Sequence, residues 1–226
     1  MPRNGPARPD VPEEPAFVTE GLLHGTPVAT PGGWRPVEGL APGDLLLTFD
    51  GGPRAVVALQ SAVVEAGPRH WPAARWPLQV PAGAMGNRWP LRLLPDQAVL
   101  LECDLADELF GDPFALIPAA ALAGWRGMAP VPPRAVEAVV TPVLDCDEAI
   151  YAGGGALVWC PGEAAPGWSG LALVPPPRGE GRVGYAALSL ASARQLVACL
   201  IAEDLGAALL RAAPWGGQAA LRLAEP

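Results

Sequence analysis

Short apolar runs, separated by frequent prolines and glycines, dominate the first two thirds of the chain. Segments such as AVVALQSAVVEA and RAVEAVVTPVL are rich in valine, and Pro-Gly, Asp-Gly and Gly-Asn pairs stand between the runs. β-Branched residues favour strands, while these pairs are typical of tight turns. The pattern predicts a mainly β fold, with one all-β domain of many short strands over residues 17–162.

The periodicity becomes helical towards the C-terminus. Residues 163–226 are predicted to hold a linker rich in glycine and proline, followed by an amphipathic α-helix over residues 189–213 with Ser189 or Ser192 as its N-cap. The apolar side chains of this helix are assigned to one stripe: Leu190, Ala193, Val197, Leu200, Ile201, Leu205, Ala208 and Leu209. We expect the stripe to pack on the β domain or, alternatively, to bind a partner or a second copy of the chain.

The N-terminus shows a different pattern, because residues 1–16 carry five prolines. Their spacing interrupts both helices and strand ladders, so it predicts an extended, flexible tail. The tail lacks the apolar core of a signal peptide, and no apolar stretch of the chain approaches the ~18 residues of a membrane span. We therefore expect no membrane span and favour the cytoplasm, with export by a non-classical route as the alternative.

Charge and cysteine content narrow the classes of function further. The formal net charge is −8, and all 15 basic residues are arginines, so an acidic surface is expected to repel nucleic acid. Cys103, Cys146, Cys160 and Cys199 are too scattered for a disulfide framework or a zinc motif, and we expect buried free thiols. No cofactor and no metal ion is expected.

Four stretches follow one another in an order that resembles the Hint domain, the module shared by hedgehog autoprocessing domains and inteins. HGTPVATPGGWRPVEGLAPGDLLLTFDGG is similar to its opening, and PLQVPAGAMGN to a strand that ends in a Gly-Ala-x-Gly-Asn turn. LRLLPDQAVLLE resembles the part that carries a catalytic histidine, and VVTPVLDCDEAIYAGGGALVWCPG resembles the closing strand pair. The resemblance covers residues 17–162, is strongest to bacterial Hint-domain proteins, and implies their fold.

The resemblance also implies a reaction, an acyl shift in which a cysteine at the first domain residue attacks the preceding carbonyl. A histidine donates a proton to the departing amide nitrogen. In this sequence Gly21 stands at the position of the cysteine, Gln97 at that of the histidine, and Asp147 at the start of a late His-Glu pair. Glycine has no nucleophile and glutamine does not exchange a proton near neutral pH, so the comparison implies that self-cleavage is lost.

Other side chains are candidates for an altered catalytic site. Thr19, Thr26 and Cys146 are the candidate nucleophiles, and His24, three residues after the glycine at the nucleophile position, is the candidate base. For His24 a structural role in a turn is the alternative.

The acidic residues offer a further possibility. Asp96 would form a paired-carboxylate site with Asp147 or Glu148 if the fold joins the two stretches, although a solvated acidic turn also explains DCDE. His70 lies among tryptophans and arginines in PRHWPAARW, a composition that suits either a cation–π ligand platform or a structural loop.

Three hypotheses of function follow from the sequence. The favoured one is a degenerate Hint domain without self-cleavage or splicing, which acts as a binding or structural module. A residual autoprocessing enzyme with a substitute nucleophile is the first alternative. The second alternative, compatible with the favoured one, is an assembly subunit that docks through residues 189–213.

Overall fold

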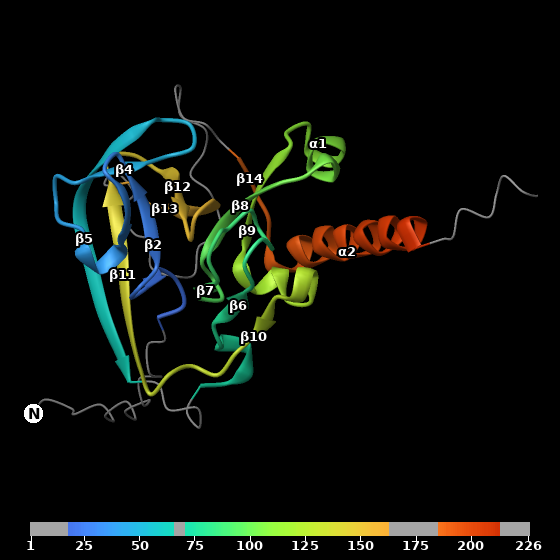
Figure 1. The fold of residues 1–226 in the computed structure, drawn as a ribbon, viewed down its shortest axis with the longest axis horizontal. Helices are drawn as coiled ribbons and strands as arrows, with labels where there is room; N and C mark the ends of the chain where they lie inside the picture. The colour runs from blue at the N-terminus through green and yellow to red at the C-terminus, as the bar shows by residue number, and fades with distance from the viewer. Residues whose placement is uncertain (1–17, 66–70, 163–184, 213–226) are drawn as a thin grey trace, which may run out of the picture.

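A computed structural model of the protein describes residues 18–65, 71–162 and 185–212. The predicted proline-rich tail, His70 and the greater part of the predicted linker lie outside these residues. The mainly β fold of many short strands, followed by a C-terminal helix, is confirmed (Figure 1).

Two sheets of seven strands each make up the body of the described residues. The first sheet has the order β10-β6-β7-β1-β11-β5-β4, and the second has the order β14-β9-β8-β13-β12-β2-β3. The first comprises β1 (Leu22–Leu23), β4 (Leu45–Leu47), β5 (Pro53–Glu65), β6 (Leu78–Val80), β7 (Leu91–Leu93), β10 (Ala129–Pro130) and β11 (Val136–Leu144). The second comprises β2 (Pro27–Thr30), β3 (Gly33–Pro36), β8 (Ala98–Glu102), β9 (Phe114–Pro118), β12 (Glu148–Ala152), β13 (Ala156–Cys160) and β14 (Ala186–Ala187).

The strand pairs of the described residues are antiparallel except for β14 beside β9. The short strand β1 lies between β7 and β11, with Leu22 paired to both Leu93 and Val140. All three of these side chains are buried, as the alternation of a half-buried sheet requires. This register presses the residue before β1 against the inner part of β11.

The core between the sheets consists of aliphatic side chains from nearly every strand. The largest fully buried ones are Leu22, Leu46, Leu78, Leu93, Leu94, Ile117, Leu122, Met128, Leu144, Ile150, Val28 and Val37. Short strands suffice here because many of them add buried side chains to one shared core.

Helical segments connect and cover the strands. They are η1 (Val37–Gly39), η2 (Ala73–Arg75), α1 (Asp104–Phe110), η3 (Ala119–Leu122), η4 (Trp125–Gly127) and α2 (Leu190–Ala212). The sequence analysis did not predict α1, because seven residues are too few to show a helical period. The apolar segment before Gly124 forms strand β9 followed by η3.

The C-terminal helix α2 lies within one residue of its predicted bounds. The Oγ of Ser189 accepts a hydrogen bond from the Ser192 N–H at 3.1 Å, which identifies Ser189 as the N-cap. The first half of the helix packs on β9, η3, η4 and α1 through Ala193, Leu196 and Leu200. No helix within the described residues combines the length and hydropathy that a membrane span needs.

Asp204 anchors the middle of α2 to η4. Its carboxylate accepts hydrogen bonds from Trp125 Nε1 at 2.9 Å and from Arg126 Nε at 3.0 Å. The Arg126 guanidinium also stacks over the Trp125 ring, 4.3 Å from its centroid. Because the two partners are consecutive residues of one turn, the carboxylate sets the direction in which the helix leaves the body.

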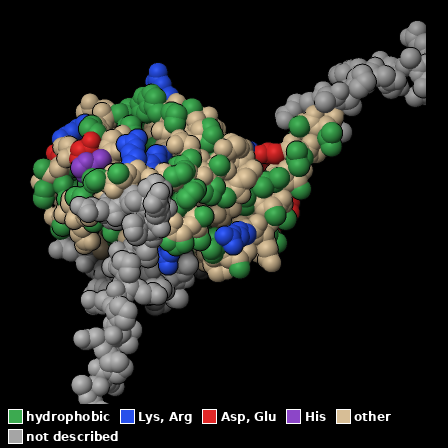
Figure 2. Space-filling model, turned by 90° about the horizontal axis from the view of Figure 1, so that it is seen from below, with side chains coloured by type: hydrophobic (Ala, Val, Ile, Leu, Met, Phe, Trp, Pro, Cys, Tyr) green, Lys and Arg blue, Asp and Glu red, His purple; other side chains and the backbone are tan. Residues whose placement is uncertain are grey.

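The prediction of one apolar stripe along α2 is wrong. The buried face includes Leu196, which the stripe omitted, while Leu205 and Leu209 are 60% and 72% exposed. The helix is apolar on two faces, and the β domain covers one of them. Its second half projects from the body, and hydrophobic side chains lie exposed along it (Figures 1 and 2).

Candidate functional site

Gly21, which the sequence analysis matched to the position of the family's cysteine, directly precedes β1 and is held by a buried hydrogen bond. Its backbone N–H donates to Oε1 of Gln97 at 2.8 Å. The structure therefore brings together the two positions that the sequence analysis matched to the family's cysteine and histidine. They are 76 residues apart in the chain.

Gln97 reaches Gly21 from the turn between β7 and β8. Its own N–H donates to the Leu94 carbonyl at 3.1 Å, and its carbonyl accepts from the Ala119 N–H at 2.9 Å. The side-chain Nε2 donates to the carbonyls of Ala98 and Trp159, both at 3.0 Å. The side chain is 5% exposed, and every polar atom of its amide has a partner.

The chemistry of these contacts is structural rather than acid–base. Oε1 of Gln97 faces the Gly21 N–H as an acceptor, so the atom nearest the backbone nitrogen has no proton to donate. The other end of the amide already donates to two carbonyls. A carboxylate at this position would leave both carbonyls facing negative charge, so the arrangement selects an uncharged side chain with a donor and an acceptor.

The space that a side chain at Gly21 would occupy is filled by β11. A Cβ added there would lie 2.6 Å from Thr141 Oγ1 and 2.6 Å from Val139 Cγ1, far inside van der Waals contact. Both neighbours are β-branched and stiff at χ1, so neither can turn aside easily. The backbone also has φ +104°, a left-handed conformation that residues other than glycine rarely adopt.

Two carboxylates flank the same backbone turn. Asp96 forms an ion pair with Arg75, with Nη1 and Oδ2 3.5 Å apart, and its N–H donates to the Thr19 carbonyl at 2.8 Å. Burial, with a smaller contribution from the negative charge of Asp96, raises the pKa of Glu20 above its ordinary value. The sequence analysis missed Glu20, which directly precedes Gly21, because nothing in its sequence neighbourhood shows that it is partly buried.

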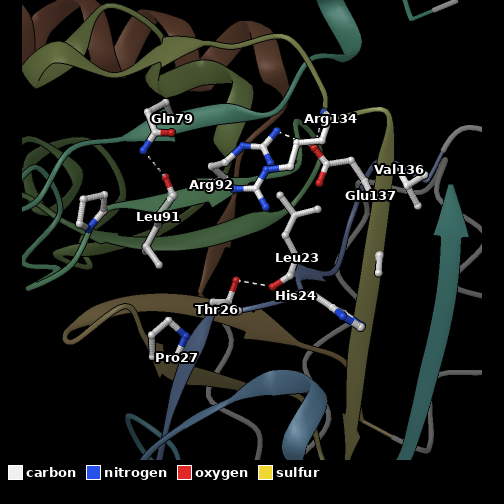
Figure 3. A pocket seen from close by; sticks show the side chains of 13 residues that line it. Leu23, His24, Thr26, Pro27, Gln79, Leu91, Arg92, Arg134, Val136 and Glu137 are labelled. Carbon is white, nitrogen blue, oxygen red and sulfur yellow. Dashed lines mark hydrogen bonds and ion pairs between the residues drawn. The ribbon is translucent and has the colours of Figure 1, made fainter. Parts of the chain in front are cut away.

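Thr26 and His24 lie in the turn after β1. The Thr26 hydroxyl is buried and donates to the Leu23 carbonyl at 2.6 Å, which closes the turn. His24 is exposed, and its backbone N–H donates to the Ala138 carbonyl at 2.9 Å. Both residues line a cavity of about 530 Å³ (Figure 3).

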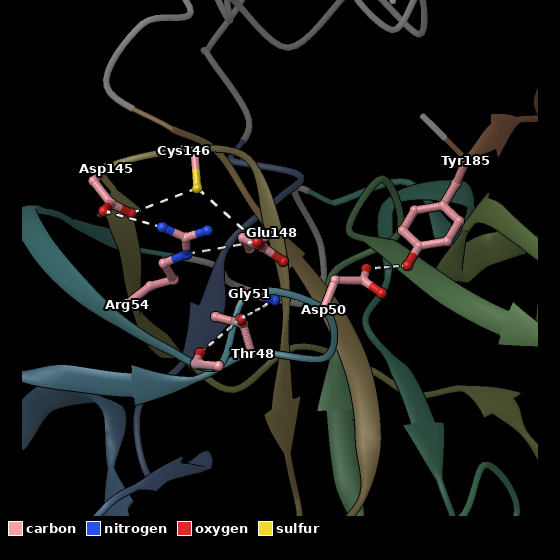
Figure 4. A network of polar contacts seen from close by, with 9 residues as sticks. Thr48, Asp50, Gly51, Arg54, Asp145, Cys146, Glu148 and Tyr185 are labelled. Carbon is pink, nitrogen blue, oxygen red and sulfur yellow. Dashed lines mark hydrogen bonds and ion pairs between the residues drawn. The ribbon is translucent and has the colours of Figure 1, made fainter. Parts of the chain in front are cut away.

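The acidic cluster lies at the other end of the sheets, around Arg54 (Figure 4). The guanidinium of Arg54 is 3.7 Å from carboxylate oxygens of both Asp145 and Glu148. Asp147 instead accepts a hydrogen bond from the Gly162 N–H at 2.7 Å. Asp96 pairs with Arg75, whereas Glu148 pairs with Arg54, so each carboxylate of the predicted pair has its own cation.

Cys146 lies inside this cluster, with its thiol directed towards Asp145 and Glu148. Burial and the neighbouring carboxylates raise the pKa of the Cys146 thiol, although Arg54 acts in the opposite direction. Burial raises the pKa of Cys160 to about 12. A raised pKa favours the thiol over the thiolate, which is the nucleophilic form.

The prediction of buried free thiols is confirmed for Cys160. All four cysteines are free, but Cys103 and Cys146 are half-buried and Cys199 is exposed on α2. Across the described part of the chain, no group of three or more histidine, cysteine, aspartate or glutamate side chains could hold a metal ion.

Comparison with known proteins places this architecture in a family. The profile of the Hint domain matches residues 20–157, more than half of the chain, so the chain belongs to the Hint-domain family. No curated protein matches it.

Solved structures of inteins and of an intein-like domain are similar over a comparable stretch. A bacterial intein-like domain from Clostridium thermocellum is 12% identical with a TM-score of 0.45, and covers 62% of this chain and 99% of its own. The MchDnaB-1 intein is 18% identical with a TM-score of 0.38, and covers 61% of this chain and 98% of its own. The Msm DnaB1 intein splicing domain, solved with zinc, is 22% identical with a TM-score of 0.34, covering 62% and 98%.

The crowding around Gly21 gives a first testable prediction. Gly21→Ala should destabilise the protein by about 1–3 kcal/mol more than Gly25→Ala, because an added Cβ at residue 21 overlaps β11. Gly25 is the matched control, since its φ is +82° and nothing lies within 4 Å of an added Cβ. Urea denaturation of both variants measures the difference, and equal losses of stability would contradict a filled site.

The raised pKa of Glu20 gives a prediction about pH. A carboxyl group whose pKa is higher in the folded state stabilises the fold below its unfolded pKa of about 4.3, and this contribution is lost as pH rises through the folded pKa. Glu20→Gln should therefore raise the melting temperature at pH 7, and the gain should disappear below about pH 4.

Glu38 supplies the control of opposite sign for that measurement. Burial acts to raise the pKa of Glu38, but the hydrogen bond from the Gly25 N–H, at 2.8 Å, leaves it lower than its ordinary value. Glu38→Gln should lower the melting temperature at pH 7. A shift of the same sign in both variants would mean that the change reflects net charge rather than the surroundings of Glu20.

Proposed function

We propose that this protein is a Hint domain that keeps the fold without self-cleavage or splicing and acts as a structural or binding module. The observation that carries the proposal is the packing of Thr141 and Val139 into the space of the missing side chain at Gly21. A thiol placed there would need β11 to move. The site therefore differs from a self-cleaving one in two ways: the thiol is absent, and side chains of β11 fill the space that it would need.

The group that would protonate the departing amide nitrogen is also absent. An acyl shift breaks the C–N bond between Glu20 and Gly21, so the departing nitrogen needs a proton. Gln97 accepts a hydrogen bond from that nitrogen and is fully engaged elsewhere. The contacts support a role for Gln97 in holding the bond in place, which is what a structural module requires.

Residual autoprocessing through a substitute nucleophile is the competing proposal. Thr26 is its least suitable nucleophile, because the hydroxyl is buried and bonded to the Leu23 carbonyl. Cys146 is paired with carboxylates around Arg54, and burial keeps its pKa high. His24 is exposed, so it remains the candidate base for any such reaction.

Intact-mass measurement decides between these two proposals. A small reporter fused ahead of Met1 should remain attached over several days at pH 7, with and without added thiol. The same fusion with a protease site at the junction shows that release would be detected. A fragment that begins at or near Gly21 overturns the proposal, and its loss in His24→Ala would identify the substitute base.

We also propose that the exposed face of α2 joins two copies of the chain. Ala198, Ala202, Leu205 and Leu209 follow one another at intervals of four, three and four residues, the spacing of a two-helix seam. All four are exposed. A second copy presents the same seam, so an isologous helix pair would cover both without any other partner.

Light scattering after size exclusion tests this second proposal. Leu205→Glu with Leu209→Glu should convert a dimer to a monomer while the melting temperature of the β domain changes little. Ser192→Glu with Ala207→Glu adds the same charge at exposed positions on the other side of the helix from Leu205 and Leu209, and this variant should remain dimeric. If the unmodified protein is a monomer at 100 µM, the proposal of a dimer is wrong.

A further inference from the structure

A cavity of about 530 Å³ opens between the turn after β1, strand β7 and the start of β11. It is separate from the Gly21–Gln97 contact, since neither residue lines it. Two arginines, Arg92 on β7 and Arg134 just before β11, direct their side chains into it beside Glu137 (Figure 3). The cavity has a size typical of small-molecule sites.

Among the charged side chains that line the cavity, two arginines face one glutamate. Glu38 lies next to it, where its carboxylate accepts the Gly25 N–H at 2.8 Å. Arg92 Nη2 lies 2.6 Å from Glu137 Oε1, and the glutamate is 4% exposed, so this ion pair is shielded from water. The same Oε1 accepts the backbone N–H of Arg134 at 2.7 Å. One carboxylate thus serves Arg92 and a backbone amide, while the Arg134 guanidinium has no acidic side chain within ion-pair distance among the described residues.

The excess positive charge is local. The whole chain has a formal net charge of −8, so its general field repels anions rather than attracting them. The buried Glu137 fixes Arg92 and the backbone of Arg134 in place, which reduces the ordering that a ligand must impose. A guanidinium presents a fork of N–H donors that matches the two oxygens of a carboxylate.

The uncharged part of the cavity wall determines which kind of anion fits best. Pro27, Pro90 and Val136 give it apolar surface, whereas Leu23 and Leu91, which also line it, are only 4% and 3% exposed. The Nε2 of Gln79 donates one of its two N–H groups to the Leu91 carbonyl at 3.1 Å, which leaves the second N–H for a ligand. An anion with an apolar body fits these surroundings better than a small inorganic ion, which would leave the apolar wall in water.

We propose that this cavity is a binding site for a small organic carboxylate, with Arg134 as its main charged contact and Arg92 as the second. The apolar body of the ligand lies against Pro27, Pro90 and Val136. The site does not depend on the loss of self-cleavage, since it uses none of the residues around Gly21.

Titration of the ¹⁵N-labelled protein with hexanoate, observed through the arginine Nε–H signals, tests the site. Hexanoate should shift the Arg92 and Arg134 signals saturably, with a Kd on the order of 1 mM for a ligand of this size. Hexanamide has the same shape without the charge and should not saturate. Equal binding of hexanamide would overturn the assignment of a carboxylate.

Variants separate a specific site from general binding. Arg134→Gln should weaken hexanoate binding about ten-fold or more, because it removes a charged hydrogen-bonding partner but keeps the backbone N–H that Glu137 uses. Arg194→Gln, on the exposed face of α2, removes the same charge elsewhere and should bind hexanoate unchanged. Equal weakening in the two variants, or none in Arg134→Gln, would overturn the proposal.

Inorganic phosphate distinguishes the remaining alternative. It should bind the unmodified protein more weakly than hexanoate, since it gains nothing from the apolar wall. Phosphate that binds as tightly as hexanoate would mean that the cavity selects charge alone and would refute the organic carboxylate. Neither result of the phosphate titration bears on self-cleavage, which the intact-mass measurement tests separately.

Discussion

The side-chain amide of Gln97 forms hydrogen bonds to both sheets, and the position of β1 in the β domain depends on this contact. Its oxygen holds the backbone before β1 of the first sheet, and its nitrogen holds carbonyls of β8 and β13 in the second. The hydrogen bond from the Gly21 N–H is buried, and the two bonds to carbonyls are partly buried, so loss of Gln97 would be costly at this contact. The amide therefore takes part in both the register of β1 and the approach of the sheets.

The position of β1 in turn decides what can exist at Gly21. Leu22 pairs with Val140, so the neighbours of Val140 in β11 occupy the space beside Gly21. Side chains of β11 and a reactive side chain at residue 21 would occupy the same space in this Hint domain. In our proposal packing has taken this space, and the pair that would carry out an acyl shift has become part of the core.

The polar side chains around the sheets divide by whether their charges are balanced. Asp96 with Arg75 is a balanced pair, whereas Arg54 faces two carboxylates, Asp145 and Glu148, so that group keeps an excess of negative charge. Neither group attracts an anion. The cavity beside Glu137 differs because two arginines meet one buried carboxylate there.

The sequence by itself determined the mainly β fold, the family, and the C-terminal helix, because turn residues, motif order and helical period are local properties. It also identified Gly21 and Gln97 as matched positions. Only the tertiary structure decided that they touch, that Val139 and Thr141 fill the space between strands, and that α2 buries Leu196 but exposes Leu205. Those facts depend on which distant strands become neighbours, and pairing over 76 or more residues leaves no periodic signal in the chain.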